Sequence, residues 1–410
     1  MDFFYKYKKI LLVVGFILLV LLLGYLLYLA FFKQPIAEAP GAPIATTTTP
    51  AGLPTAKPGA GQIVTPSEET GLPGETAARA PDTIAHGGLT QTSQLNQMPS
   101  LAAVLASNGS DLQYYNQNDG KFYRLTKDGQ TALLSDKIFY QVENITWSPD
   151  KNKAILEYPD GSNIIYDFLI KKQITLPIHW KDFAFSPDGS KVVMKSLGLD
   201  PDNRWLAITN NDGSKARRLE ALGNKDETVY PSWSPNNQTV ALYTEGIDFD
   251  RQEVFFVGLH GENFKSMVIE GRGFQPQWSP QGDRLLYSVY SSNNDLKPLL
   301  WIANAEGDTI GSNRKNLNME TWANKCVFAN SVDLYCAVPE KLEEGAGLFP
   351  EMAKNTKDNL YKIDTQTGLK KLVAIPDNNY NMSNLMISSN NYYLYFTDEA
   401  TKTLHKINLK

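Results

Sequence analysis

Histidine and cysteine are scarce in this chain of 410 residues, which has only four of the first and two of the second. The histidines, His86, His179, His260 and His405, lie far apart in the sequence, so no histidine metal site is predicted. The sequence also lacks a G-x-S-x-G nucleophile elbow, a P-loop and an H-E-x-x-H motif. We therefore predict no catalysis, no cofactor and no metal. The net charge of −5 at pH 7 also argues against a nucleic-acid partner bound through its phosphates.

Charged residues are absent from Ile10 to Phe32, a stretch that is mostly Leu, Val and Ile. As a helix it would span about 34 Å, which is enough to cross a bilayer. Three lysines precede it and one, Lys33, follows, so the positive-inside rule places residues 1–33 as a cytoplasmic tip and membrane anchor. The alternative is a signal peptide cleaved near Ala37-Glu38-Ala39. The apolar stretch is longer than usual for such a peptide, and this favours an uncleaved anchor.

Aromatic residues are absent from residues 34–100, which hold ten of the 23 prolines of the chain. A segment of this composition buries too little apolar surface to offset the entropy lost on ordering. We predict a disordered linker between the anchor and a domain that spans residues 101–410.

Four copies of one short pattern recur in that domain, and their prolines lie 38, 48 and 45 residues apart. The pattern is an aromatic residue, then Ser-Pro, then a turn residue, followed by an apolar run. Its members are Trp147, Pro149 and Asp150; Phe185, Pro187, Asp188 and Gly189; Trp233 and Pro235; and Trp278, Pro280 and Gly282. Proline followed by Asp, Asn or Gly favours a tight turn, so each copy predicts a β-hairpin.

A second hairpin follows in each repeat, most clearly around Asn211-Asp212-Gly213. Four strands in a unit of about 45 residues are typical of a β-propeller blade. The chain thus resembles the TolB-type propellers, whose repeats are also called PD40 or WD40-like. The resemblance implies an extracytoplasmic envelope protein, which here would be anchored in the cytoplasmic membrane of a bacterium.

Counting third strands predicts seven four-stranded blades, with six or eight as alternatives. The chain ends before the last blade has a fourth strand, so part of residues 88–98 is a candidate to close the ring. A β-sandwich would fit the strands but not their regular repetition. Three repeats have lost the motif, at residues 106–109, 328–330 and 387–390, so those three blades are less well defined.

Long insertions are expected on one face of the propeller, because second-to-third-strand loops and blade crossings share that face. They lie at residues 196–203, 244–252, 291–297 and 339–358. Loops on a rigid scaffold commonly carry function, and aromatic residues suit recognition. The candidate partner-binding residues are Tyr140, Trp180, Tyr230, Phe274, Trp322, Tyr380, Asp248, Asp250, Arg251, Arg204, Leu348 and Phe349. For each aromatic residue, packing between blades is the alternative role.

Cys326 and Cys336 flank a turn at Asn330-Ser331-Val332 and are expected opposite each other on two strands. An extracytoplasmic location would permit a disulfide, and two buried thiols are the alternative.

The favoured interpretation is a membrane-anchored, extracytoplasmic protein-interaction or scaffold module of the cell envelope, whose partner is a protein or a glycan. The alternative is a propeller enzyme or sensor acting on a glycan, peptide or small ligand at the central channel.

Overall fold

The structure, a computed structural model, describes residues 16–26 and 80–410. The chain divides into two compact units, Met1–Pro73 and Gly74–Lys410. Residues 16–26 are helical. In the part of the chain that is described, no helix is long and apolar enough to cross a membrane. The predicted span and linker extend over residues 10–15, 27–32 and 34–79, which lie outside the described residues.

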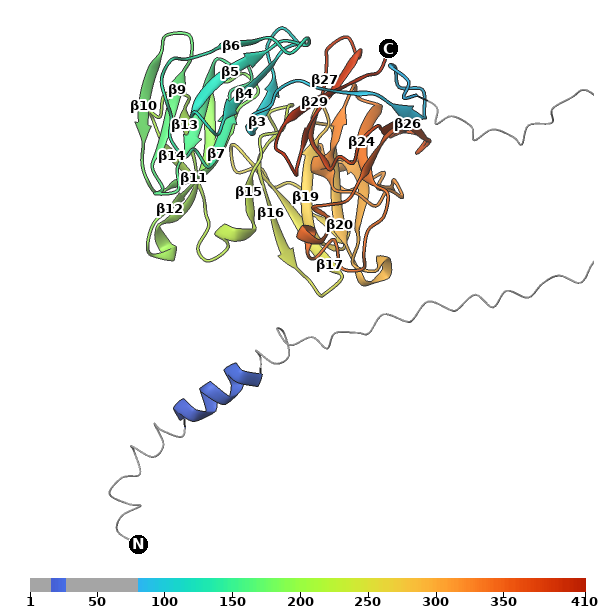
Figure 1. Ribbon diagram of the computed structural model, residues 1–410. Helices are drawn as coiled ribbons and strands as arrows, with labels where there is room; N and C mark the ends of the chain where they lie inside the picture. The colour runs from blue at the N-terminus through green and yellow to red at the C-terminus, as the bar shows by residue number, and fades with distance from the viewer. Residues whose placement is uncertain (1–15, 27–79) are drawn as a thin grey trace, which may run out of the picture. The chain divides into compact units, whose positions relative to one another are not determined.

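The second unit is an all-β propeller of seven blades, which confirms the predicted fold (Figure 1). The first four blades are β3 (Ser100–Leu105), β4 (Leu112–Asn116), β5 (Lys121–Leu125) and β6 (Thr131–Leu133); β7 (Asn144–Trp147), β8 (Lys153–Glu157), β9 (Asn163–Asp167) and β10 (Lys172–Leu176); β11 (Trp180–Phe185), β12 (Lys191–Leu197), β13 (Arg204–Asn210) and β14 (Arg217–Ala221); and β15 (Val229–Pro231), β16 (Thr239–Gly246), β17 (Arg251–Gly258) and β18 (Met267–Glu270).

The last three blades are β19 (Arg272–Trp278), β20 (Arg284–Tyr290), β21 (Pro298–Asn304) and β22 (Lys315–Asn316); β23 (Cys326–Phe328), β24 (Asp333–Pro339), β25 (Asp358–Asp364), β26 (Lys370–Pro376) and β1 (Leu89–Thr90); and β27 (Met382–Ile387), β28 (Tyr393–Asp398), β29 (Leu404–Asn408) and β2 (Thr92–Gln94). Short 3-10 helices are η1 (Pro201–Asn203), η2 (Asp226–Thr228), η3 (Ser292–Asn294), η4 (Gly307–Thr309), η5 (Ala323–Lys325) and η6 (Pro350–Ala353).

The ring is closed by residues upstream of the first blade. β2 pairs antiparallel with β29 and supplies the outer strand of blade 7. β1 adds to blade 6 as a parallel fifth strand beside β26. In Figure 1 the blue start of the propeller lies beside the red β26, β27 and β29. The propeller therefore takes in chain from residue 80 onward, ahead of the expected start at residue 101.

Seven apolar clusters hold the ring together, one between each pair of neighbouring blades. The cluster between blades 1 and 2 shows how the repeat aromatic contributes. Trp147 packs there against Phe122 and donates its indole N–H to the carbonyl of Ala102, 2.8 Å away. The motif aromatic thus joins one blade to the preceding one.

The serine of the motif fixes the hairpin turn in five of the seven blades. Ser234, which is fully buried, accepts a hydrogen bond from the N–H of Thr239, with 2.9 Å between nitrogen and Oγ. The equivalent serines of four other blades make the same bond to the residue five positions on; they are Ser148, Ser186, Ser279 and Ser388. Ser388 belongs to one of the repeats without the proline motif, so the hydrogen bond of the turn is kept there although the sequence pattern is lost.

Candidate functional site

Three long loops of blades 4, 5 and 6 lie side by side on the crossing face of the propeller. The blade 4 loop is residues 247–250, the blade 5 loop is residues 291–297 and the blade 6 loop is residues 340–357. We call them together the loop rim. Sequence analysis predicted all three as insertions on this face.

Hydrogen bonds join the first two loops of the rim. Asp250 accepts bonds from the backbone N–H of Ser292, at 2.7 Å, and from its hydroxyl. Arg272, at the start of β19, donates to the carbonyl of Asp248 at 2.8 Å. Its guanidinium packs so closely on Gly246 that a Cβ there would lie 2.3 Å from a guanidinium nitrogen. The blade 4 loop therefore has one fixed position against blade 5.

The blade 5 and blade 6 loops are joined through a strained segment of backbone. Asp295 and Leu296 both adopt positive φ angles, 51° and 52°. This conformation is unusual for a bulky residue such as leucine. Their carbonyl oxygens accept hydrogen bonds from Gly345 and Gly347, each at 2.8 Å. The strained conformation thus presents two acceptors to the neighbouring loop.

The blade 6 loop has a small core of its own, formed by Trp322, Leu342, Ala346 and Ala353. The amide of Asn381, at the crossing into blade 7, donates to the carbonyls of Ala353 and Lys354. With its inner side held in this way, the loop exposes Leu348, Phe349 and Met352 to solvent.

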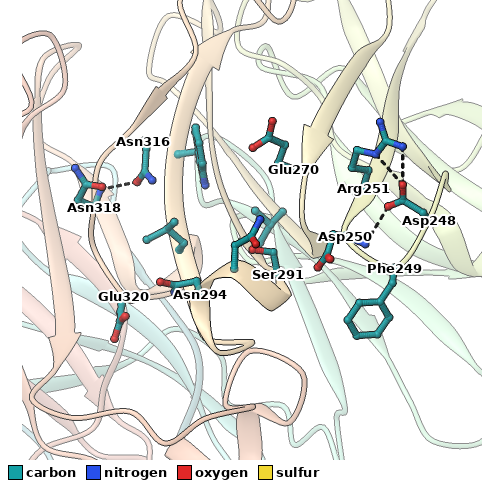
Figure 2. A pocket seen from close by; sticks show the side chains of 14 residues that line it. Asp248, Phe249, Asp250, Arg251, Glu270, Ser291, Asn294, Asn316, Asn318 and Glu320 are labelled. Atoms are coloured by element: carbon teal, nitrogen blue, oxygen red, sulfur yellow. Dashed lines mark hydrogen bonds and ion pairs between the residues drawn. The ribbon is translucent and has the colours of Figure 1, made fainter.

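A cavity of about 940 Å³ opens between blades 4 and 5 beside the loop rim (Figure 2). Its apolar part is formed by Phe249, Val289, Leu299 and Trp301. Its polar lining comprises Asp248, Asp250, Arg251, Glu270, Ser291, Asn293, Asn294, Asn316, Asn318 and Glu320. We refer to it as the wedge cavity. Three residues predicted from the sequence, Asp248, Asp250 and Arg251, meet here.

Charge in the wedge cavity is only partly neutralised within the protein. Arg251 pairs with Asp248 at 2.7 Å, and its hydrogen bond lowers the pKa of that carboxyl. Among the described residues, neither Glu270 nor Glu320 has an ion pair or a hydrogen-bonding partner for its side chain. The cavity therefore keeps an excess of carboxylate charge.

The other predicted residues are spread over the same face in different environments. Tyr140 is 73% exposed and Tyr230 is also exposed. Trp180, Phe274 and Trp322 are buried in apolar clusters. Tyr380 is half-buried, 4.6 Å from the ring of His405. Arg204 pairs with Asp226 at 2.9 Å. Most of the aromatic residues in the connections between blades are used in packing. The exposed apolar surface of this face therefore comes mainly from the loops.

Sequence reasoning missed a buried ion pair where blades 6 and 7 meet. Lys325 and Asp358 form an ion pair of 2.7 Å, with side chains 7% and 0% exposed. Lys325 also donates to the Asn381 side chain at 2.7 Å, and Asp358 accepts from the N–H of Met382. Desolvation raises the pKa of Asp358 to about 6, against the opposing effect of Lys325. Charged residues such as Lys325 and Asp358 are expected to be solvated when only the sequence is known, and nothing in their spacing indicated this pairing.

Lys325 and Asn381 also line a second cavity, of about 370 Å³, together with Gln275, Asn324, Glu351 and Glu399. Within the described residues there is no group of three or more His, Cys, Asp or Glu side chains able to hold a metal ion.

The two cysteines lie directly opposite each other in the β23–β24 hairpin and are joined as a disulfide. Both are buried between blades 5 and 6.

No family model and no curated protein matches the chain. Solved structures with a similar fold include an oligogalacturonate lyase in complex with manganese, with 13% identity, a TM-score of 0.51, and coverage of 78% of this chain and 93% of that one. The oligogalacturonate lyase of Vibrio parahaemolyticus has 12% identity, a TM-score of 0.50 and the same coverage. The tricorn protease has 12% identity and a TM-score of 0.51 over 78% of this chain and 34% of that one. At these identities the likeness extends to the propeller fold alone.

Proposed function

We propose that this chain is a non-catalytic interaction module, which binds a protein of the cell envelope through the loop rim of blades 4 to 6. The observation that carries the proposal is the gathering of exposed apolar side chains on this rim: Ile247, Phe249, Leu348, Phe349 and Met352. Phe249 is 62% exposed and Phe349 is 52% exposed. Exposed apolar side chains on loops that are fixed by hydrogen bonds are typical of a binding surface.

The proposal includes the membrane tether. Its support is the uncharged stretch Ile10–Phe32 with lysines before it, followed by the proline-rich residues 34–79. The propeller would then be held on the extracytoplasmic side of the cytoplasmic membrane, at some distance from the bilayer. The resemblance of the repeats to TolB-type propellers supports an envelope partner.

A matched pair of variants tests the protein-binding role. Replacing the whole blade 6 loop would expose Trp322 and disturb the Lys325–Asp358 pair, so substitutions at its exposed side chains are preferable. We expect Leu348→Ser, Phe349→Ser and Met352→Ser, combined, to abolish cross-linking of a dominant partner in intact cells. Leu169→Ser with Ile170→Ser, on the opposite face and more exposed, serves as the control. Equal partner recovery from both variants would refute the role of the blade 6 loop.

A ligand-dependent enzyme or sensor acting at the central channel is the second candidate. The cavity lined by Lys325 and Asn381 favours it, because buried charged groups in a cleft are common at functional sites. In the same cross-linking experiment, the absence of any protein partner with the unmodified chain would favour this candidate.

A further inference from the structure

The wedge cavity between blades 4 and 5 has features that protein contact at the loop tips does not require. The apolar cluster between these blades contains Leu242, Val254 and Tyr287 and ends near Val289. Beyond that point, toward the crossing face, the blades separate and polar side chains replace apolar ones. The resulting cavity of about 940 Å³ is at the upper end of the size range of small-molecule sites.

One side of the wedge cavity is apolar and aromatic. Leu299 and Trp301 lie on β21, where Trp301 packs at the edge of the apolar cluster between the blades. The indole N–H of Trp301 is buried, and it has no hydrogen-bond partner among the described residues. This side offers an apolar surface suited to the C–H groups of a ligand.

The remaining lining mixes hydrogen-bond donors and acceptors from separate segments. The Oδ1 of Asn316 accepts a hydrogen bond from the backbone N–H of Asn318 at 2.6 Å. The amide NH₂ group of Asn316 can therefore donate to a ligand. The side chains of Asn293 and Asn318 make no hydrogen bond within the described chain. Figure 2 shows Glu270, Asn294, Asn316 and Glu320 among the side chains that line the cavity, together with Arg251 paired to Asp248.

This lining restricts the chemistry of the ligand. Carboxylates must accept hydrogen bonds, whereas amide and guanidinium N–H groups must donate them. A hydroxyl group does both, and a lysine or arginine side chain of a partner can only donate. A phosphate or a uronic acid would meet the repulsion of Glu270, Glu320 and Asp250.

We propose that the wedge cavity is a binding site for a saccharide that carries no acidic group. The apolar face of a sugar ring lies on Trp301 and Leu299, and its hydroxyl groups bond to Glu270, Glu320 and the asparagine amides. Phe249 belongs both to this lining and to the exposed apolar side chains of the loop rim, whereas Leu348, Phe349 and Met352, which the protein-binding test changes, do not line the cavity.

The test is calorimetric titration of the purified full-length chain with maltohexaose, cellohexaose and N-acetylchitohexaose. Hexagalacturonate and hexalysine serve as acidic and basic probes. We expect at least one neutral oligosaccharide to bind with a Kd of about 1 mM or tighter. Glu270→Gln and Glu320→Gln, which keep the shape of the side chain, are each expected to weaken it roughly tenfold. Glu306→Gln makes the same change on the opposite face of blade 5 and should leave the Kd unchanged.

Three results would overturn the proposal. The first is that none of the neutral oligosaccharides binds. The second is a Kd that stays the same in Glu270→Gln and Glu320→Gln, which would place the site elsewhere. The third is that hexalysine is the only probe that binds, and that Glu270→Gln and Glu320→Gln each abolish its binding. This result would assign the cavity to a basic segment of a protein. The variant with serine at Leu348, Phe349 and Met352 should keep its affinity for the saccharide. Failure of the protein-binding role can therefore be distinguished from failure of the saccharide site.

Discussion

The residue that preserves the repeat is the motif serine rather than its aromatic or proline neighbours. Ser388 bonds the N–H of Tyr393 without a proline beside it. In blades 1 and 6 alanine replaces this serine, and an asparagine holds the turn, two positions after the alanine in blade 1 and one position after it in blade 6. Asn108 accepts the N–H of Asp111 at 3.0 Å, and Asn330 accepts the N–H of Asp333 at 2.8 Å. The same turn therefore persists where the sequence pattern has been lost.

Loss of one motif serine should lower the stability of the protein markedly, because the turn is buried. In Ser234→Ala the N–H of Thr239 would lose its acceptor in a region closed to water. We expect the free energy of unfolding to fall by about 1–3 kcal/mol. Urea titration monitored by tryptophan fluorescence would measure it. Ser190→Ala, at an exposed turn position of blade 3, is expected to change stability by less than about 0.5 kcal/mol. Equal effects of the two substitutions would contradict this account of the motif.

Sequence reasoning predicted the fold well because a hairpin turn is determined by residues close together in the chain. It predicted the positions of the long loops for the same reason. It could not predict that Asp250 bonds Ser292 or that Asp295 bonds Gly345, because those partners are about 40 to 50 residues apart and meet only when the blades pack. It also did not separate Tyr140, which is exposed, from Phe274, which likewise precedes the motif aromatic of its repeat but is buried.

At the level of single elements, the β23–β24 hairpin contains the only disulfide of the described chain. Its inner strand has three residues and its motif serine is missing. A cross-link of sequence separation 10 reduces the entropy of the unfolded hairpin. The disulfide therefore adds a covalent constraint to a hairpin whose turn is held by Asn330 in place of the motif serine.

Removing the disulfide should lower stability by a measurable amount. For Cys326→Ala with Cys336→Ala we expect a loss of about 2–3 kcal/mol in the free energy of unfolding. Reductant should destabilise the wild-type chain and leave the double variant unchanged. Alkylation followed by intact-mass analysis checks the starting state, and two alkylated thiols in unreduced protein extracted from the envelope would show that the bridge does not form there.

At the scale of the whole molecule, the ring depends on residues 80–96, which connect the last two blades. Leu95 lies in the cluster between blades 7 and 1, and Asn96 accepts the N–H of Leu404 at 2.8 Å. Ala85 lies in the cluster between blades 6 and 7 and donates its N–H to the carbonyl of Asn408. Both strands of this segment cover edges of blades that would otherwise be exposed.

A truncated chain tests whether this segment closes the propeller. Starting the chain at Gln97 removes β1, β2 and Leu95, and so leaves the edge of β29 unpaired. We expect a loss on the order of 3–5 kcal/mol in stability, together with concentration-dependent association through the exposed edge. A chain that starts at Ala80 keeps every described contact of the propeller and should unfold like the full-length protein. Thermal unfolding and light scattering of the two truncated chains separate these outcomes. Identical midpoints without association would mean that blade 7 is stable with three strands and that the ring does not depend on this closure.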